Sequence, residues 1–267
     1  MRTRDFILSI LILLAGCNSL LNSNDGDVSY PAILKKKSKR KQAALARKYR
    51  EANPGLCAEV DQYGLNGDKV CPFRNTLRVE ITDTDIPRLK KMARTFLTKN
   101  KDFTNIEDPE QLDLEKIYKI KGCLKCNGSK ENIVPIGLKL SYKNQVYNRL
   151  EIKHTGVDVF LDAKKVYQVY NHWYQNIIVP QSDKLDYQDV KDILIGKKIT
   201  YYDWTGKNTI TITKDSFNEY ENKVIYPYET NQGLEFRVCL VVGAGIWHFY
   251  IDSTTGELIH KKQMIIF

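Results

Sequence analysis

The chain has 267 residues, of which 42% are apolar and 27% are charged, fractions typical of a globular protein. Its net charge of +9 comes from one segment, because residues 35–50 hold nine Lys/Arg and no acid, and nine subtracted from nine leaves the rest neutral. This distribution excludes a broad basic surface of the kind that binds nucleic acid.

The first residues have the pattern of an export signal. Arg2 and Arg4 precede an apolar run over residues 6–14. A membrane-spanning helix needs about 20 apolar residues, so this run is too short to be an anchor. We therefore predict a signal peptide over residues 1–16, with the remaining chain, about 250 residues, forming one large or two ordinary domains.

The signal ends in Leu14-Ala15-Gly16-Cys17. This tetrapeptide resembles the lipobox of bacterial lipoproteins, in which the cysteine is acylated, with palmitate among the fatty acids, and becomes the mature N-terminus. The resemblance implies a lipoprotein anchored through Cys17 at the cell envelope. We expect the outer membrane as its location, with the polypeptide in an oxidising compartment such as the periplasm.

Residues 17–55 are predicted to form a polar tether followed by a basic helix that starts near Ser38 and stops at Asn53-Pro54-Gly55. The helix either rests on anionic head groups or is simply solvated. Nucleic-acid binding is disfavoured, since Tyr49 is its one aromatic residue. The candidate membrane-surface residues are Lys35, Lys36, Lys37, Lys39, Arg40, Lys41, Arg47, Lys48 and Arg50.

Residues 56–132 are predicted to form a small cysteine-containing module. Residues 76–81 alternate like a strand, and Asp85-Ile86-Pro87 opens a helix with one apolar face. A second short helix is expected from Asp108-Pro109 onward, extending to Tyr118.

Residues 133–267 are predicted to form an antiparallel-sheet domain, and the 16 tyrosines also favour β-structure. A helix is expected over 185–194, and residues 199–204 and 209–213 form a hairpin. The other expected strands are 136–142, 145–152, 157–161, 166–174, 234–242, 247–251 and 257–266. The predicted fold class is α+β, with helices packed on antiparallel sheets.

Two stretches resemble known families. Residues 147–174 resemble the strand-turn-strand core of fungalysin/thermolysin propeptide domains, and residues 234–259 resemble the end of a PepSY domain, whose helix would begin at 185–190. The resemblance implies a cystatin-like fold and a role in inhibiting or chaperoning a secreted metallopeptidase. No His-Glu-x-x-His motif occurs in the sequence, so we expect a freestanding binding module rather than a peptidase.

The remaining cysteines allow several interpretations. Cys57, Cys71, Cys123 and Cys126 are candidates for structural disulfides in an exported protein, which is the simplest interpretation. Cys123-x-x-Cys126 also fits a thioredoxin-like redox pair, and the four together fit a zinc site less well because the spacing of Cys57 and Cys71 is wrong. Cys239 lies in an apolar run and is predicted to be buried.

No catalytic motif stands out, so we predict no enzyme activity, no cofactor and no metal. The histidines are His154, His172, His248 and His260; His172 and His248 lie in aromatic strands, where a hydrogen-bonded structural role is expected. The leading hypothesis is a lipid-anchored envelope module that binds an unidentified protein and restrains or escorts a secreted peptidase. The alternatives are an assembly component of a surface complex and a thiol-disulfide oxidoreductase using Cys123 and Cys126.

Overall fold

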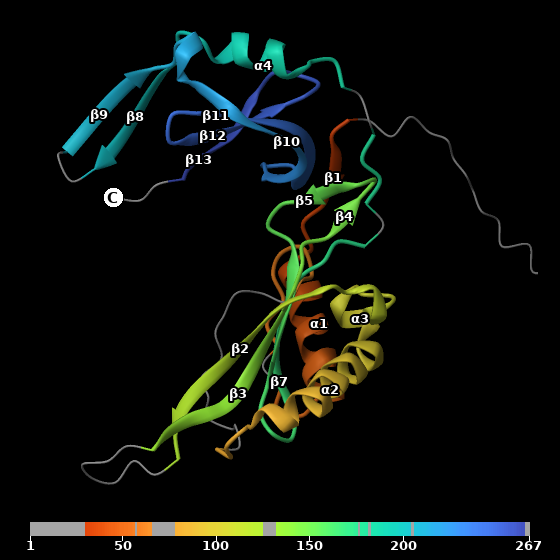
Figure 1. Cartoon of the computed structure of the whole chain (residues 1–267). Helices are drawn as coiled ribbons and strands as arrows, with labels where there is room; N and C mark the ends of the chain where they lie inside the picture. Colours follow the sequence, from red (N-terminus) through yellow and green to blue (C-terminus); the bar gives the residue numbers. More distant parts are fainter. Residues whose placement is uncertain are drawn as a thin grey trace, which may run out of the picture.

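The protein is an α+β molecule, which confirms the predicted fold class, and it is made of two units that each place a helix on an antiparallel sheet (Figure 1). The first unit spans residues 78–175 and the second spans residues 177–264. A segment that precedes them, residues 30–65, is called the strap below. The computed structural model describes residues 30–56, 58–65, 78–124, 132–175, 177–180, 183–203 and 206–264.

The first unit is built on the four-stranded sheet β2-β3-β6-β7. Leu89, Ala93 and Leu97, spaced by four residues, are fully buried on α2 and face the sheet core that contains Leu138 and Val159. Its elements are η1 (Asp83–Asp85), α2 (Ile86–Lys99), α3 (Lys101–Thr104), η2 (Pro109–Gln111), β2 (Leu114–Cys123), β3 (Ile133–Tyr142), β6 (Gly156–Leu161) and β7 (Val166–His172).

The second unit repeats this plan on the strands β10-β11-β12-β13. Val190 and Leu194 of its helix pack on Leu240, Val242 and Phe249. Its elements are α4 (Tyr187–Leu194), the separate hairpin β8 (Lys198–Asp203) and β9 (Gly206–Thr211), η3 (Lys214–Ser216), β10 (Phe217–Glu229), β11 (Leu234–Ala244), β12 (Trp247–Asp252) and β13 (Leu258–Gln263).

The last hairpin of each unit turns on a buried aspartate. Asp162 Oδ1 accepts from the amides of Lys164 (2.8 Å) and Lys165 (2.9 Å) between β6 and β7. Asp252 Oδ1 accepts from the amides of Thr254 (2.8 Å) and Thr255 (2.9 Å) between β12 and β13. In each turn the aspartate therefore accepts from the amides of residues i+2 and i+3, in the manner expected of Asx turns.

A β-bulge precedes each aspartate by the same distance. The register shifts between Phe160 and Leu161 in the first unit and between Tyr250 and Ile251 in the second. Because both the bulge and the turn recur, the two units contain the same type of hairpin. This hairpin lies at the end of each stretch that resembles a propeptide or PepSY domain, residues 147–174 and 234–259.

Strands from outside the second unit extend its sheet. β4 (Val146–Tyr147) and β5 (Leu150–Ile152) leave the first unit, and β5 pairs in parallel with β10. β1 (Ala32–Leu34) of the strap pairs with β11. Backbone hydrogen bonds between β5 and β10 therefore join the two units. The pairing of β2 with β3 also joins residues on both sides of the boundary predicted after residue 132.

Several predicted elements differ from the structure. The helix expected from Asp108 to Tyr118 is wrong, because only η2 forms and residues 114–123 pair with β3. The expected strand over 145–152 is the short hairpin of β4 and β5. Of the strand predicted over residues 76–81, residues 76 and 77 lie outside the described residues. Residues 78–81 form no strand, although the Ile81 amide donates to the Pro135 carbonyl. β10 was not predicted, since its first half is polar.

The aspartate turns give a stability prediction. Asp162→Ala removes one turn and is expected to cost about 1–3 kcal/mol, because two amides lose their acceptor. Asp252→Ala is expected to cost about 3–5 kcal/mol, because this carboxylate also neutralises a buried arginine, described below. Urea unfolding of both variants measures the difference, with the exposed Asp215→Ala as control. Equal losses for Asp162 and Asp252 would contradict the prediction.

Candidate functional site

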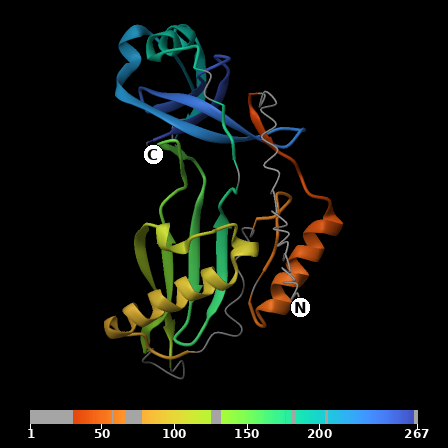
Figure 2. The ribbon, with the colours of Figure 1, turned by 90° about the vertical axis from the view of Figure 1, so that its right-hand side faces the viewer.

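The strap contacts both units along its length. β1 lies at the sheet of the second unit, while α1 (Lys39–Ala52) lies beside the first unit (Figure 2). The Tyr49 ring stacks on Phe103 with centroids 4.4 Å apart, and Asn53 Nδ2 donates to Asn100 Oδ1 at 2.6 Å. The strap therefore contacts both units and spans the boundary between them, which is called the seam.

A buried polar network holds the start of the strap. Tyr30 Oη donates to Asp252 Oδ2 at 2.9 Å and accepts from the Val238 amide at 3.0 Å. Arg237 donates to the same Asp252 oxygen at 3.0 Å and to Glu235 Oε2 at 2.8 Å. Burial, and then the charge of Asp252, raises the pKa of Tyr30, so the phenol stays protonated and remains a donor.

The guanidinium in this network is surrounded by opposite charge. Asp252 is fully buried and Glu235 is 7% exposed. Burial alone would lower the pKa of Arg237, but the hydrogen bonds that it donates to Glu235 and Asp252, and the charges of these carboxylates, raise it instead. Arg237 is the one cation inside the apolar run of β11, and this isolated charge was the sequence signal for the network.

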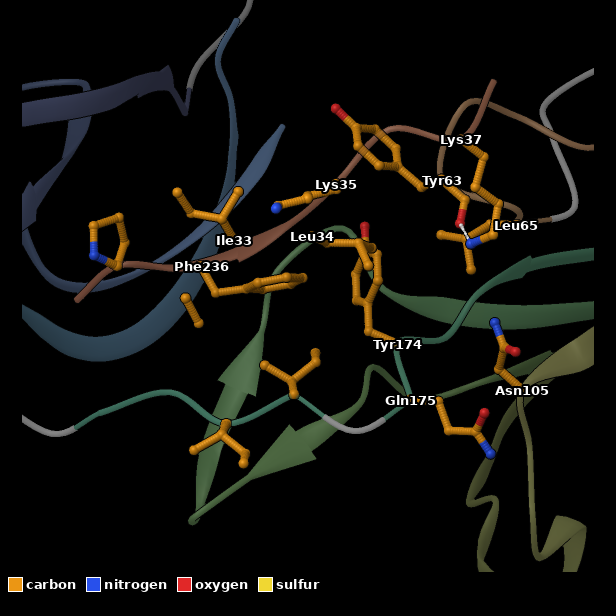
Figure 3. A pocket seen from close by; sticks show the side chains of 14 residues that line it. Ile33, Leu34, Lys35, Lys37, Tyr63, Leu65, Asn105, Tyr174, Gln175 and Phe236 are labelled. Atoms are coloured by element: carbon orange, nitrogen blue, oxygen red, sulfur yellow. Dashed lines mark hydrogen bonds between the residues drawn. The ribbon is translucent and has the colours of Figure 1, made fainter. Parts of the chain in front are cut away.

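A pocket of about 690 Å³ opens between the strap and the two units (Figure 3). Phe236 and Tyr174 form its floor and pack edge to face with centroids 4.9 Å apart. Ile33 and Ile178 are 39% and 59% exposed at its rim. Its lining residues are Pro31, Ala32, Ile33, Leu34, Lys35, Lys37, Tyr63, Leu65, Asn105, Tyr174, Gln175, Ile177, Ile178 and Phe236.

The polar groups that line this pocket can form hydrogen bonds to a ligand. Lys37 Nζ donates to the Tyr63 carbonyl at 2.7 Å, and Gln175 is engaged with Glu107 at 2.8 Å. Lys35 is exposed and forms no ion pair with any other residue that the structure describes. The described lining offers amides, lysines and tyrosines, without a carboxylate, histidine or thiol. Burial and the neighbouring Glu229 raise the pKa of Tyr63 to about 12, so this phenol is neutral.

The basic side chains of the predicted segment are exposed, apart from that of Lys37, which is half-buried. Ala46 and Tyr49 are the buried residues of α1, and its basic side chains cover the remaining circumference. Lys36 pairs with Glu229 at 3.0 Å, so it is partly neutralised. Whether the segment contacts a membrane stays a prediction.

Among the predicted cysteines, Cys123 ends β2 and is disulfide-bonded. Cys17, Cys57, Cys71 and Cys126 lie outside the described residues, so the pairing stays a prediction. Cys239 is a buried free thiol whose pKa is raised by burial, which confirms its prediction as a core residue.

The described residues contain no group of three His, Cys, Asp or Glu side chains placed to hold a metal ion. No helix in the described ranges is both long and apolar enough to cross a membrane.

The units, strap and pocket define a two-unit α+β protein with an apolar site at its seam. No protein-family model and no curated protein matches the chain. One similar solved structure is the Bacillus megaterium YpeB C-terminal domain, with 11% identity, coverage of 86% of this chain and 99% of that chain, and a TM-score of 0.31. This is a weak resemblance to a PepSY-containing protein.

The hydroxyl of Tyr30 provides a test of how the strap is held. Tyr30→Phe is expected to lower the free energy of unfolding by about 1–2 kcal/mol, because the Val238 amide and Asp252 both lose a partner. Tyr147→Phe is the control, since the Tyr147 hydroxyl bonds to no other described residue, and a change below about 0.5 kcal/mol is expected. Equal changes in thermal or urea unfolding would argue against the network.

Proposed function

We propose that this protein is a membrane-tethered binding module of the cell envelope, and that the pocket at its seam accepts an apolar segment of a partner protein. The observation that carries the proposal is the pocket itself, which has an apolar floor and two exposed isoleucines at its rim. Binding sites of this kind are concave and mostly apolar, with a few polar groups that orient the ligand.

An extended segment fits this pocket better than a compact ligand. β1 borders the pocket and pairs with β11 along one edge, and no described strand pairs with the other edge. A free edge next to an apolar groove is the arrangement used in β-augmentation, in which a partner strand adds to a sheet. Lys35, at the end of β1, would favour an acidic residue in that partner.

A secreted peptidase is the partner class that we test first. The support is the resemblance of residues 147–174 and 234–259 to propeptide and PepSY domains, together with the hairpin that both stretches share. The lipid on Cys17 and the basic surface of α1 would hold the module at an anionic membrane, where each Lys or Arg near the surface contributes about 1 kcal/mol.

The experiment uses the full-length protein and two isoleucine variants. Ile178→Asp places a charge at the pocket rim, while Ile133→Asp places one at a similarly exposed residue at the start of β3. Affinity capture from envelope extracts is expected to recover a peptidase with the wild type and with Ile133→Asp, and about tenfold less with Ile178→Asp.

The captured peptidase is then assayed with and without the module. A fall in proteolysis that is lost with Ile178→Asp supports restraint of the peptidase. Capture of other proteins without any effect on proteolysis would favour the assembly role instead. Equal capture by both variants would show that the pocket is not the binding site.

A further inference from the structure

The four histidines of the chain come from distant segments, and each of them interacts electrostatically with another histidine or with Lys153 or Lys262. His154 follows β5 and interacts with His172, at the end of β7, and with Lys153 and Lys262. His260 interacts with His154 and Lys262, and His248 interacts with the same lysine. None of these histidines and lysines lines the apolar pocket.

A second pocket, here named the histidine pocket, is found at this place. It has a volume of about 320 Å³ and is the more polar and enclosed of the two sites. Both units contribute to it, the first through the loops around β5 and the second through β12 and β13. Its lining residues are Asn144, Lys153, His154, Tyr250, His260 and Lys262.

Aromatic rings fix the imidazoles of this pocket. The His260 ring stacks on Tyr226 with centroids 5.1 Å apart and lies 5.5 Å from the Tyr250 ring. His154 Nε2 lies 3.2 Å from Tyr226 Oη, so the two histidines meet across one tyrosine. His154 also has a φ of 57°, in the left-handed region that few residues other than glycine adopt.

The positive charge of the pocket is only partly compensated. Glu151 accepts from Lys153 Nζ at 2.6 Å and from Asn144 Nδ2 at 2.5 Å. Burial would raise the pKa of Glu151, but these hydrogen bonds and the charge of Lys153 lower it, so one carboxylate offsets one lysine. Lys262 and the ring nitrogens of His260 have no hydrogen-bond partner among the described residues.

We infer that the histidine pocket binds a small doubly charged oxyanion of the phosphate or sulfate type. Two lysine ammoniums, two imidazoles, one amide and one phenol converge on a volume that is too small for a peptide. Charge-assisted hydrogen bonds from such donors are the usual means of holding phosphate oxygens. An anion would also supply hydrogen-bond partners for Lys262 and His260, for which the described residues provide none.

Binding is expected to be coupled to pH through the imidazoles. Burial is the largest cause that lowers the pKa of both His154 and His260. Lys262 and Lys153 lower the pKa of His154 further, and His154 and Lys262 lower that of His260, so both imidazoles are neutral at pH 7. A dianion beside them favours their protonated forms, so binding takes up protons and tightens as the pH falls. The charged and titratable groups that face these rings are Lys153, Lys262, Glu151, His172, Tyr226 and Tyr250.

Sulfate is the best first probe, because its charge is constant between about pH 5 and pH 8 while histidine titrates. Calorimetric titration of the full-length protein is expected to show saturable sulfate binding, at least about tenfold tighter at pH 5.5 than at pH 8. Lys262→Gln is expected to weaken binding about tenfold. Lys261→Gln is the matched control, since Lys261 lies over the Trp247 ring on the other face of β13.

The proposal fails if sulfate shows no saturable binding, or if Lys261→Gln and Lys262→Gln weaken binding equally. It also fails if His260→Gln keeps the full pH dependence while circular dichroism shows that this variant is folded. Competition identifies the source of the anion. Displacement of sulfate by vesicles that contain phosphatidic acid, whose headgroup is a phosphate monoester, supports a lipid headgroup, whereas displacement by inorganic phosphate alone supports a free ion.

The same histidines predict how stability varies with pH. His154, His248 and His260 have folded-state pKa values below 6.5, so the unfolded chain binds more protons as the pH falls below that value. Their contribution to stability is complete above pH 6.5 and is lost as the pH falls through the folded pKa values. The Tm is expected to fall less between pH 7.5 and pH 5 in His260→Gln than in the wild type, and sulfate is expected to reduce the wild-type loss. A wild-type loss no larger than that of the variant would contradict this.

Discussion

The structure depends on how a buried carboxylate is neutralised at the seam of the molecule. Asp252 accepts hydrogen bonds from two amides of its own turn, from Arg237 and from Tyr30. These four bonds match the four lone-pair sites of a carboxylate, which is the condition under which a buried charge is tolerated. The last hairpin, the central strand β11 and the strap are thereby tied to one side chain.

The repeated hairpin explains how one plan serves two purposes. Both units use a buried aspartate after a β-bulge, so both last strands leave their turn in the same way. In the second unit, Asp252 Oδ2 also accepts hydrogen bonds from Tyr30 and Arg237, and the bond from Tyr30 holds the strap at the sheet. Since β1 then continues the sheet beside β11, the apolar pocket forms between the strap and Phe236.

Both candidate sites require the two units together. Tyr174 of the first unit and Phe236 of the second meet in the apolar pocket, and His154 and His260 meet in the histidine pocket. The parallel pairing of β5 with β10 holds these surfaces in register. Neither site would exist in an isolated unit, which is a physical reason for the units to be joined by strands rather than by a flexible linker.

The sequence alone predicted the α+β class, the helix that opens at residues 85–87, the helix over 185–194 and most hairpins, because side-chain period and turn chemistry are local properties. Only the tertiary structure decided that residues 114–123 pair as a strand and that the polar start of β10 continues a central strand, since both depend on distant partners. The same holds for the sites. Tyr30 and Asp252 are 222 residues apart, and nothing in the local pattern of either residue indicates the other.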